Sequence, residues 1–339
     1  MVDVMPSALG PLHPRHGLHE PTSGTPVRTP GSVRRTATTD MVRPDGLTGP
    51  LVLLGRARDL RTSSDGTGVV VDTASCRAMV DFVAGRILRE VDTDPARPAL
   101  DGLVGERVAS GFRSAVERVD PALPTESGLL HLLLDDFPVT TLVSGHAFAA
   151  GVPAEALLPM ASGRPHFVRD LCAGFADGGT IMNGVDSVGR PPVVTGPAAL
   201  PLESADPLAW HETEPLSAPH AMRRWRRMDV RPGTPAVVDV LYRDSYVRPD
   251  GLETVIHEYT VAMTVDADAG VVLSCEATPR VLPWVECPVA AASARRLAGL
   301  PLDGLRSTVR NTFTGTSTCT HLNDTLRALE DVPALLSLG

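Results

Sequence analysis

The residues best suited to chemistry are two cysteines and a histidine near the C-terminus, Cys287, Cys319 and His321. Thiolates and imidazoles are ligands that zinc prefers, and three of them would leave one coordination position open. Cys287 lies at the predicted start of a helix, where the helix dipole favours a thiolate. The three residues therefore predict a metal site, for zinc or, by analogy with iron–sulfur scaffolds, for a cluster. The alternative is packing and helix capping, because cysteine is commonly buried.

Two histidines are each followed by an aspartate about one helical turn later. His321 has Asp324 at position i+3 and His131 has Asp135 at position i+4, so each pair shares one face of a helix. Because a carboxylate can fix the tautomer of an imidazole, His321, Asp324 and His131 are candidate catalytic residues. The competing interpretation is a helix start, since Thr320 and Asp324 are also typical of one.

Doubled arginines occur twice, as Arg34-Arg35 and Arg223-Arg224. A doubled arginine could clamp the carboxylate or phosphate of a ligand. The same side chains could instead form ion pairs that hold the chain in register. The candidate partners for such pairs are Asp40, Asp59, Asp229 and Asp244.

One predicted strand carries His257 and Glu258, which alternation places on opposite faces. Glu258 would bind a polar ligand or form a buried ion pair with the neighbouring Arg-Asp strand. His257 shares its face with Val255 and Tyr259, where a single histidine is usually a satisfied core residue.

Familiar catalytic motifs are missing from the sequence. It contains no G-x-S-x-G, H-E-x-x-H or G-x-G-x-x-G pattern. The glycine-rich stretch Asp177-Gly-Gly-Thr180 lacks the lysine of a phosphate-binding loop. Hydrolases, metalloproteases and dinucleotide-binding enzymes of the common kinds therefore lose their main support.

Short matches recur in the same order in the two halves of the chain. They pair Val33-Arg34-Arg35 and Asp40 with Met222-Arg223-Arg224 and Asp229, Arg58-Asp59 with Arg243-Asp244, Val80-Asp81 with Val265-Asp266, Arg113-Ser114 with Arg306-Ser307, and His131-Leu132 with His321-Leu322. Collinear matches with nearly constant spacing are hard to produce by chance. They predict a tandem duplication.

The second copy consists of predicted strands followed by predicted helices. Three segments rich in Val, Tyr and Thr and separated by turn residues predict an antiparallel meander, namely residues 236–247, 253–265 and 271–278. Helical spacing follows in residues 289–297, 305–313 and 322–329. Strands followed by helices indicate an α+β fold. We expect two such copies, packed as a pseudo-twofold pair.

These boundaries divide the chain into four parts. We expect a flexible arm over residues 1–30, a first α+β copy over 31–148, a Pro/Gly-rich insert over 149–221 and a second copy over 222–339. The insert is longer than an ordinary connection, and we expect it to pack across both copies.

Composition limits the partners. The net charge of −9 provides no basic field for a phosphate backbone, so nucleic acid is not expected as a partner. No apolar run is long enough to span a bilayer, and no membrane partner is expected. Residues 1–50 contain no apolar run typical of a signal peptide or membrane anchor, which predicts a cytoplasmic protein. The five cysteines are few and odd in number, and no structural disulfide is expected.

The C-terminal half resembles a bacterial family catalogued as domain of unknown function 2889. The resemblance lies in Arg280-Val-Leu-Pro-Trp-Val-Glu-Cys-Pro288 and in Cys319-Thr-His-Leu322. In the first copy, Leu129 stands where Cys319 stands in the second. The family implies an organisation of strands and helices but no activity.

The leading functional expectation is a soluble bacterial enzyme or ligand-binding protein with a small-molecule pocket between the two copies. The histidines and doubled arginines would supply its polar contacts. One alternative is a metal-binding scaffold or carrier that uses Cys287, Cys319 and His321. A second alternative is a structural or assembly module.

Overall fold

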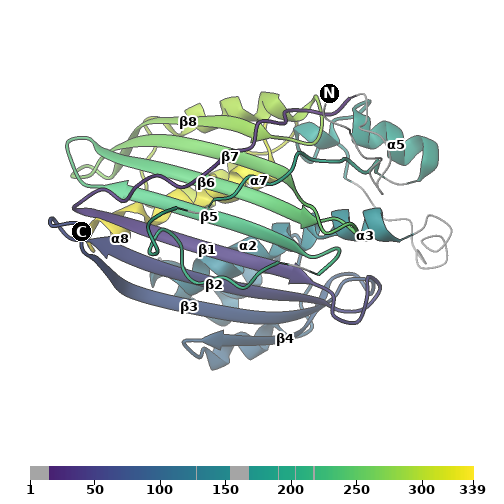
Figure 1. The fold of residues 1–339 in the computed structure, drawn as a ribbon, viewed down its shortest axis with the longest axis horizontal. Coiled ribbons are helices and arrows are strands. Elements are labelled where there is room, and N and C mark those ends of the chain that lie inside the picture. Colours follow the sequence, from purple (N-terminus) through teal and green to yellow (C-terminus); the bar gives the residue numbers. More distant parts are fainter. Residues whose placement is uncertain (1–14, 127, 153–167, 190, 203, 217) are drawn as a thin grey trace.

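The computed structural model describes residues 15–339 apart from residues 127, 153–167, 190, 203 and 217. Its centre is one antiparallel sheet with the strand order β4-β3-β2-β1-β5-β6-β7-β8 (Figure 1). The strands are β1 (Ser32–Val42), β2 (Leu51–Thr62), β3 (Gly68–Asp81), β4 (Ile87–Asp94), β5 (Met222–Arg231), β6 (Ala236–Val247), β7 (Glu253–Asp266) and β8 (Val271–Val281). Two four-stranded meanders therefore form a single eight-stranded sheet, because β1 pairs with β5.

The β1–β5 pair places arginines of each strand opposite aspartates of the other. Arg34 lies opposite Asp229, and Asp40 lies opposite Arg223. Opposite charges facing each other across antiparallel strands stabilise the pairing, so these positions favour this register over a shifted one. Outward from this pair, the strands follow the same hairpin order on both sides.

Helices cover one face of the sheet and lie behind it in Figure 1. Helix α2 packs on β1, β2 and β3 and against α7, while α8 packs on β5. The described α-helices are α1 (Phe112–Val119), α2 (Leu129–Val143), α3 (Gly145–Gly151), α5 (Thr180–Val188), α6 (Leu305–Thr312), α7 (Thr320–Ala328) and α8 (Val332–Leu336). Short 3-10 helices are η1 (Pro98–Leu103), η2 (Leu123–Glu126), η3 (Ala173–Phe175), η4 (Cys287–Leu297) and η5 (Leu329–Asp331).

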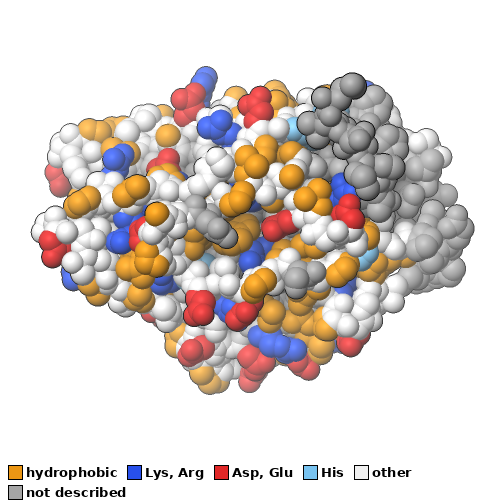
Figure 2. Space-filling view, in the orientation of Figure 1, with side chains coloured by type: hydrophobic (Ala, Val, Ile, Leu, Met, Phe, Trp, Pro, Cys, Tyr) orange, Lys and Arg blue, Asp and Glu red, His pale blue; other side chains and the backbone are white. Residues whose placement is uncertain are grey.

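Extended segments cross the other face of the sheet, in front of the strands in Figure 1. Residues 15–30 run along the C-terminal half, where the backbone of Glu20 donates to the carbonyl of Arg280 over 2.9 Å. Part of the insert contacts both halves: Arg58 of β2 donates to the carbonyl of Leu208, and Arg243 of β6 donates to that of Leu200. Acidic, basic and apolar side chains are interspersed on this face (Figure 2).

The coarse fold prediction is confirmed, since the chain combines an antiparallel sheet with helices. In the C-terminal half the predicted strands and the last two predicted helices lie within a few residues of their observed bounds. The segment predicted as a helix over 289–297 is the 3-10 helix η4. The predicted flexible arm lies on the sheet from residue 15 onward, and residues 1–14 are outside the described range. No helix among the described residues could cross a membrane.

Gly196 sets how closely the insert approaches β7. A Cβ atom at this position would lie 1.8 Å from the carbonyl oxygen of Val255. We therefore expect Gly196→Ala to lift the insert from β7 and to destabilise the protein by about 1–3 kcal/mol. Urea unfolding measures the loss, and hydrogen exchange of residues 195–200 should rise. The exposed Ala198→Ser serves as a control, and equal stability of both variants would contradict the close approach.

Candidate metal-binding site

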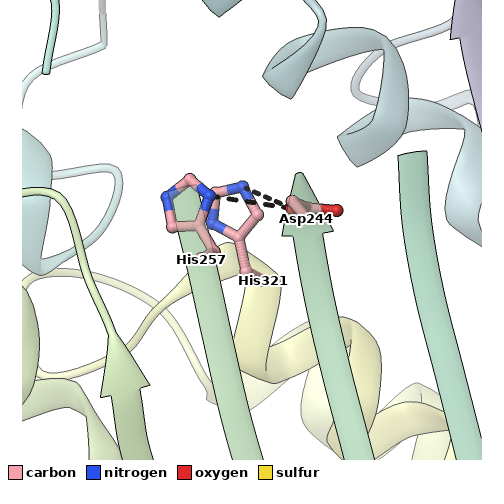
Figure 3. Close-up of side chains that lie close together, drawn as sticks. All are labelled: Asp244, His257 and His321. Atoms are coloured by element: carbon pink, nitrogen blue, oxygen red, sulfur yellow. Dashed lines mark ion pairs between the residues drawn. The ribbon is translucent and has the colours of Figure 1, made fainter. Parts of the chain in front are cut away.

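Three polar side chains converge between the sheet and α7: Asp244 of β6, His257 of β7 and His321 of α7 (Figure 3). Their ligand atoms lie within 4.8 Å of one another. Nδ1 of His257 is 3.6 Å and Nε2 of His321 is 3.9 Å from Oδ2 of Asp244. The two imidazole rings stack with centroids 3.7 Å apart. Among the described residues, these side chains are brought close enough to hold a metal ion together.

Strand register and helix docking position the three residues. Asp244 lies directly opposite His257 in the β6–β7 hairpin, so both side chains point to the helix-covered face. A register irregularity follows between Asp244 and Ser245, and it interrupts the regular alternation of side chains between the two faces near this end of β6. His321 is the second residue of α7, and its ring lies flat against that of His257.

Asp244 stays ionised although it is fully buried. Burial is the largest single effect and raises the pKa of this carboxyl, but Arg224 together with the neighbouring His257 and His321 outweighs it and holds the pKa well below its usual range. Nε of Arg224 donates to Oδ1 over 2.9 Å, and the Tyr242 hydroxyl donates to Oδ2 over 2.5 Å. Ligating carboxylates are commonly held by such hydrogen bonds. Asp244 is therefore a preoriented anion.

The imidazole of His321 is neutral. Burial lowers its pKa well below the usual value, and the neighbouring His257 lowers it further. In the part of the chain that the structure describes, Nε2 of His321 and Nδ1 of His257 are buried and have no hydrogen-bond partner. A buried nitrogen without a partner is unfavourable, whereas its lone pair is free to bind a metal ion.

The ligand spacing is close to that of an occupied site. Two atoms that each lie about 2.1 Å from a metal ion are about 3.4 Å apart in tetrahedral geometry. The separations of 3.6 Å and 3.9 Å exceed that value by a few tenths of an ångström.

Of the predicted cysteine ligands, Cys319 contacts a member of this group. Sγ of Cys319 is 3.7 Å from Nδ1 of His321, on the side of the ring away from Asp244. Burial raises the pKa of Cys319 to about 12 and raises that of Cys287 well above its usual value. Both are buried, neutral thiols, and neither Cys287 nor Cys319 joins the group of converging ligands, so of the predicted metal ligands only His321 lies in it. All five cysteines are free.

The predicted His–Asp pairs have other partners. Asp324 accepts hydrogen bonds from Arg113, Arg224 and Arg327 at 3.0, 3.1 and 2.6 Å, while the ion-pair contact of His321 is with Asp244. Asp135 likewise binds Arg113 and Arg327. His131 is buried, and its Nδ1 has no partner among the described residues.

The doubled arginines and Glu258 are engaged in ion pairs. Arg34 binds Asp229, Arg223 binds Asp40, Arg35 binds Asp59 and Asp331, and Arg224 binds Asp244 and Asp324. The two arginines of each doublet point to opposite faces, because they are neighbours on a strand. Glu258 binds Arg243 over 2.6 Å and accepts the backbone N–H of Thr22 over 2.6 Å.

Two cavities can be compared with the small-molecule pocket expected between the two copies. The cavity at the β1–β5 junction has a volume of about 10 Å³ and is lined by Arg35, Leu132, Arg226, Met228 and Asp331 among others. It has room for about one water molecule. A larger hollow of about 370 Å³ lies between β6, β7, β8 and η4, entirely within the C-terminal half.

Sequence reasoning paired Asp244 with arginines and assigned His257 to the core, so their convergence was missed. The sequence signal that could have revealed it is the predicted hairpin. One of its strands carries Arg243-Asp244, the other carries His257-Glu258, and a short turn between them places these polar residues opposite each other. The contribution of His321 depends on how α7 docks, which the hairpin does not specify.

Comparison with known proteins places the site within a recognised family domain. No curated protein and no solved structure matches the chain. Residues 222–334, from the start of β5 into α8, match the model of a family described as protein of unknown function (DUF2889). The C-terminal half, which holds Asp244, His257 and His321, thus carries the sequence pattern of the DUF2889 family.

Proposed function

We propose that this protein binds a divalent transition-metal ion through Asp244, His257 and His321 and uses it in an enzymatic or ligand-binding role. The observation that carries the proposal is the convergence, within 4.8 Å, of one carboxylate oxygen and two imidazole nitrogens that have no hydrogen-bond partner in the described part of the chain. Two imidazoles and a carboxylate suit zinc or iron(II), and three protein ligands leave positions open for water or a substrate.

The surrounding side chains support this assignment. Arg224 and Tyr242 hold the carboxylate of Asp244, and Cys319 contacts the second nitrogen of the His321 ring. Groups that orient first ligands in this way are a regular part of metal sites. Packing alone would not require the nitrogens of His257 and His321 to lie 3.6 and 3.9 Å from one ionised aspartate.

Metal titration tests the proposal. Untagged protein, dialysed against a chelator, is titrated anaerobically with Co²⁺ and Zn²⁺. We expect one equivalent of Co²⁺ per chain with visible ligand-field bands that Zn²⁺ displaces. His257→Ala and His321→Ala should each weaken Co²⁺ binding by about 100-fold or more.

His131→Leu is the matched control, because it removes a buried histidine that also has a partnerless nitrogen but lies outside the site. This variant should bind Co²⁺ as the wild type does. Binding of less than a fifth of an equivalent by the wild type would reject the metal site and favour the structural-module alternative. Undiminished binding by both alanine variants would place any ion elsewhere.

We further propose that the two halves arose by tandem duplication and pack as a pseudo-twofold pair. The outward strand order and the reciprocal pairs Arg34–Asp229 and Arg223–Asp40 support this proposal. The cavity of about 10 Å³ lined by Arg35, Arg226 and Asp331 has no room for a small molecule. We therefore place the proposed ligand at the end of the sheet, near Asp244.

A further inference from the structure

A partly buried arginine at the end of β1 has no carboxylate partner among the residues that the structure describes. Arg43 follows β1, and its Nη2 donates to the carbonyl and hydroxyl oxygens of Ser144 at 3.3 and 3.2 Å. Its Nε and Nη1 are buried and have no hydrogen-bond partner among the described residues. The guanidinium also lies 4.9 Å from the centre of the Phe82 ring. Burial lowers the pKa of Arg43 to about 10.

Arg43 differs in this respect from the doubled arginines, all of which bind aspartates. A charge that is removed from water without a counter-ion is strongly unfavourable. Aromatic contact and two long hydrogen bonds to neutral oxygens compensate for only part of this cost. Within the described part of the chain, the guanidinium of Arg43 therefore lacks a counter-ion.

Two histidines lie close to the same end of the sheet. His146 of α3 contacts Tyr246 edge-on, with ring centroids 4.8 Å apart, and its Nε2 has no partner among the described residues. Nδ1 of His220, just before β5, shares a hydrogen bond of 2.8 Å with the Tyr246 hydroxyl. Tyr246 lies two residues after Asp244 near the end of β6, so these groups lie at the same end of the sheet as the proposed metal site.

Contacts connect these groups in space, because Arg43 binds Ser144 directly before α3 and a Cβ atom at Gly151 of α3 would lie 2.7 Å from Cε1 of His220. The electrostatics agree with these contacts. Burial lowers the pKa of His220, and Arg43 lowers it further. The pKa of His146 is lowered to about 3 by burial and then by His257 and His220. His146 thus lies within electrostatic range of His257 on the metal side and of His220, which is itself coupled to Arg43.

We propose that Arg43, His146 and His220 form a binding site for an oxyanion, the carboxylate or phosphate group of a small molecule, next to Asp244, His257 and His321. A guanidinium recognises both groups by charge-assisted hydrogen bonds, and imidazole N–H groups add donors. The site needs no bound metal, so this inference does not depend on the metal proposal. If both hold, one ligand anchored by its anionic end would reach the open metal positions.

Anion titration monitored by NMR tests the site, because it reports on Arg43 directly. The Nε–H resonance of Arg43 is followed in metal-free protein at constant ionic strength while phosphate or acetate replaces chloride. We expect a saturable shift with a dissociation constant in the millimolar range or below. A response to phosphate alone indicates a phosphate-bearing ligand, and a response to acetate indicates a carboxylate.

Variants separate a built site from general charge effects. Arg43→Gln should weaken the anion-dependent rise in melting temperature at least tenfold in apparent affinity, while Arg118→Gln should not change it. Arg118 is an exposed arginine paired with Glu106 on the surface. Absence of a saturable shift with either anion, or an unchanged response in Arg43→Gln, overturns the proposal. The wild-type NMR titration decides the question even if Arg43→Gln does not fold.

Repeating the titration with Zn²⁺ present distinguishes the two proposals. Anion binding without metal binding would leave the oxyanion site standing and reject the metal site. Metal binding without any anion response would support the metal site and reject the oxyanion site.

Discussion

Arg224→Met is expected to lower the free energy of unfolding by about 3–5 kcal/mol, because it removes the cation of a fully buried ion-pair network. Arg224 is 1% exposed and binds Asp244 and Asp324, both 0% exposed, with Asp136 3.6 Å away. Asp324 and Asp136 keep other arginines, whereas Asp244 keeps only Tyr242 and the two histidines. The large cost therefore arises mainly from Asp244. Urea unfolding at pH 7.5 in chelator measures it.

Two controls show whether burial is responsible. Arg223→Met, on the neighbouring position, removes the pair with Asp40, whose side chain is 16% exposed, and should cost less than Arg224→Met. Arg77→Met removes a pair in which both side chains are about half exposed, and should change stability by about 1 kcal/mol or less. If Arg224→Met costs no more than Arg77→Met, the network does not hold the fold together.

Stability is expected to fall steeply as the pH drops below about 6.5, before most carboxylates titrate. Burial, assisted by Arg306, lowers the pKa of His131 to about 4. Burial also lowers the pKa values of His146 and His211 to about 3, with neighbouring histidines contributing to the first and Arg58 to the second. In the unfolded chain a histidine has a pKa of about 6.5.

At a pH between the folded and the unfolded pKa of these histidines, the unfolded state binds protons that the folded state does not. Acid therefore favours unfolding. Each group contributes up to about 1.4 kcal/mol per pH unit, and the three together contribute about 4 kcal/mol per unit. Their stabilisation is fully present above pH 6.5 and is lost progressively towards pH 4 or 3. A protein of ordinary stability, about 5–15 kcal/mol, would then unfold near pH 5 or below.

Buried carboxylates such as Asp135 extend the loss of stability to lower pH. Burial raises the pKa of Asp135, but Arg327 and Arg113 outweigh it and hold the pKa well below its usual range. The stabilisation from Asp135 is therefore present above the unfolded pKa of about 4 and is lost only as the pH falls below it.

Urea unfolding of metal-free protein at pH 7.5, 6.5 and 5.5 measures this dependence. His131→Leu should reduce the slope by about one group, or 1.4 kcal/mol per pH unit, whatever its effect at pH 7.5. A flat stability between pH 6.5 and 5.5 would mean that the buried histidines titrate normally.

In the C-terminal half, the residue pattern of most segments was sufficient to predict their secondary structure. Alternating Val, Tyr and Thr around the turns near Gly251 and Gly270 predict β6, β7 and β8 nearly to the residue. Helical spacing likewise predicts α6 and α7. The segment after Pro288 was expected as a helix of unstated type and is the 3-10 helix η4. Its spacing alone could not distinguish the two helix types.

The partners of the polar side chains were decided by tertiary structure. The sequence identified Arg34, Arg223, Asp40 and Asp229 as related, but only the pairing of β1 with β5 made them reciprocal ion pairs. Likewise, His321 was singled out with Asp324, yet its observed carboxylate contact is Asp244. Periodicity specifies which face of an element a side chain occupies, not which element packs on that face.

The candidate metal site depends both on the local sequence and on tertiary packing. The sequence by itself determined that Asp244 and His257 would lie on paired strands and that His321 would begin a helix. The docking of α7 on β6 and β7 decided that the three would meet, because long-range packing brings together residues far apart in the chain. It also decided that Cys319 contacts the ring of His321 while Cys287 stays outside the ligand group.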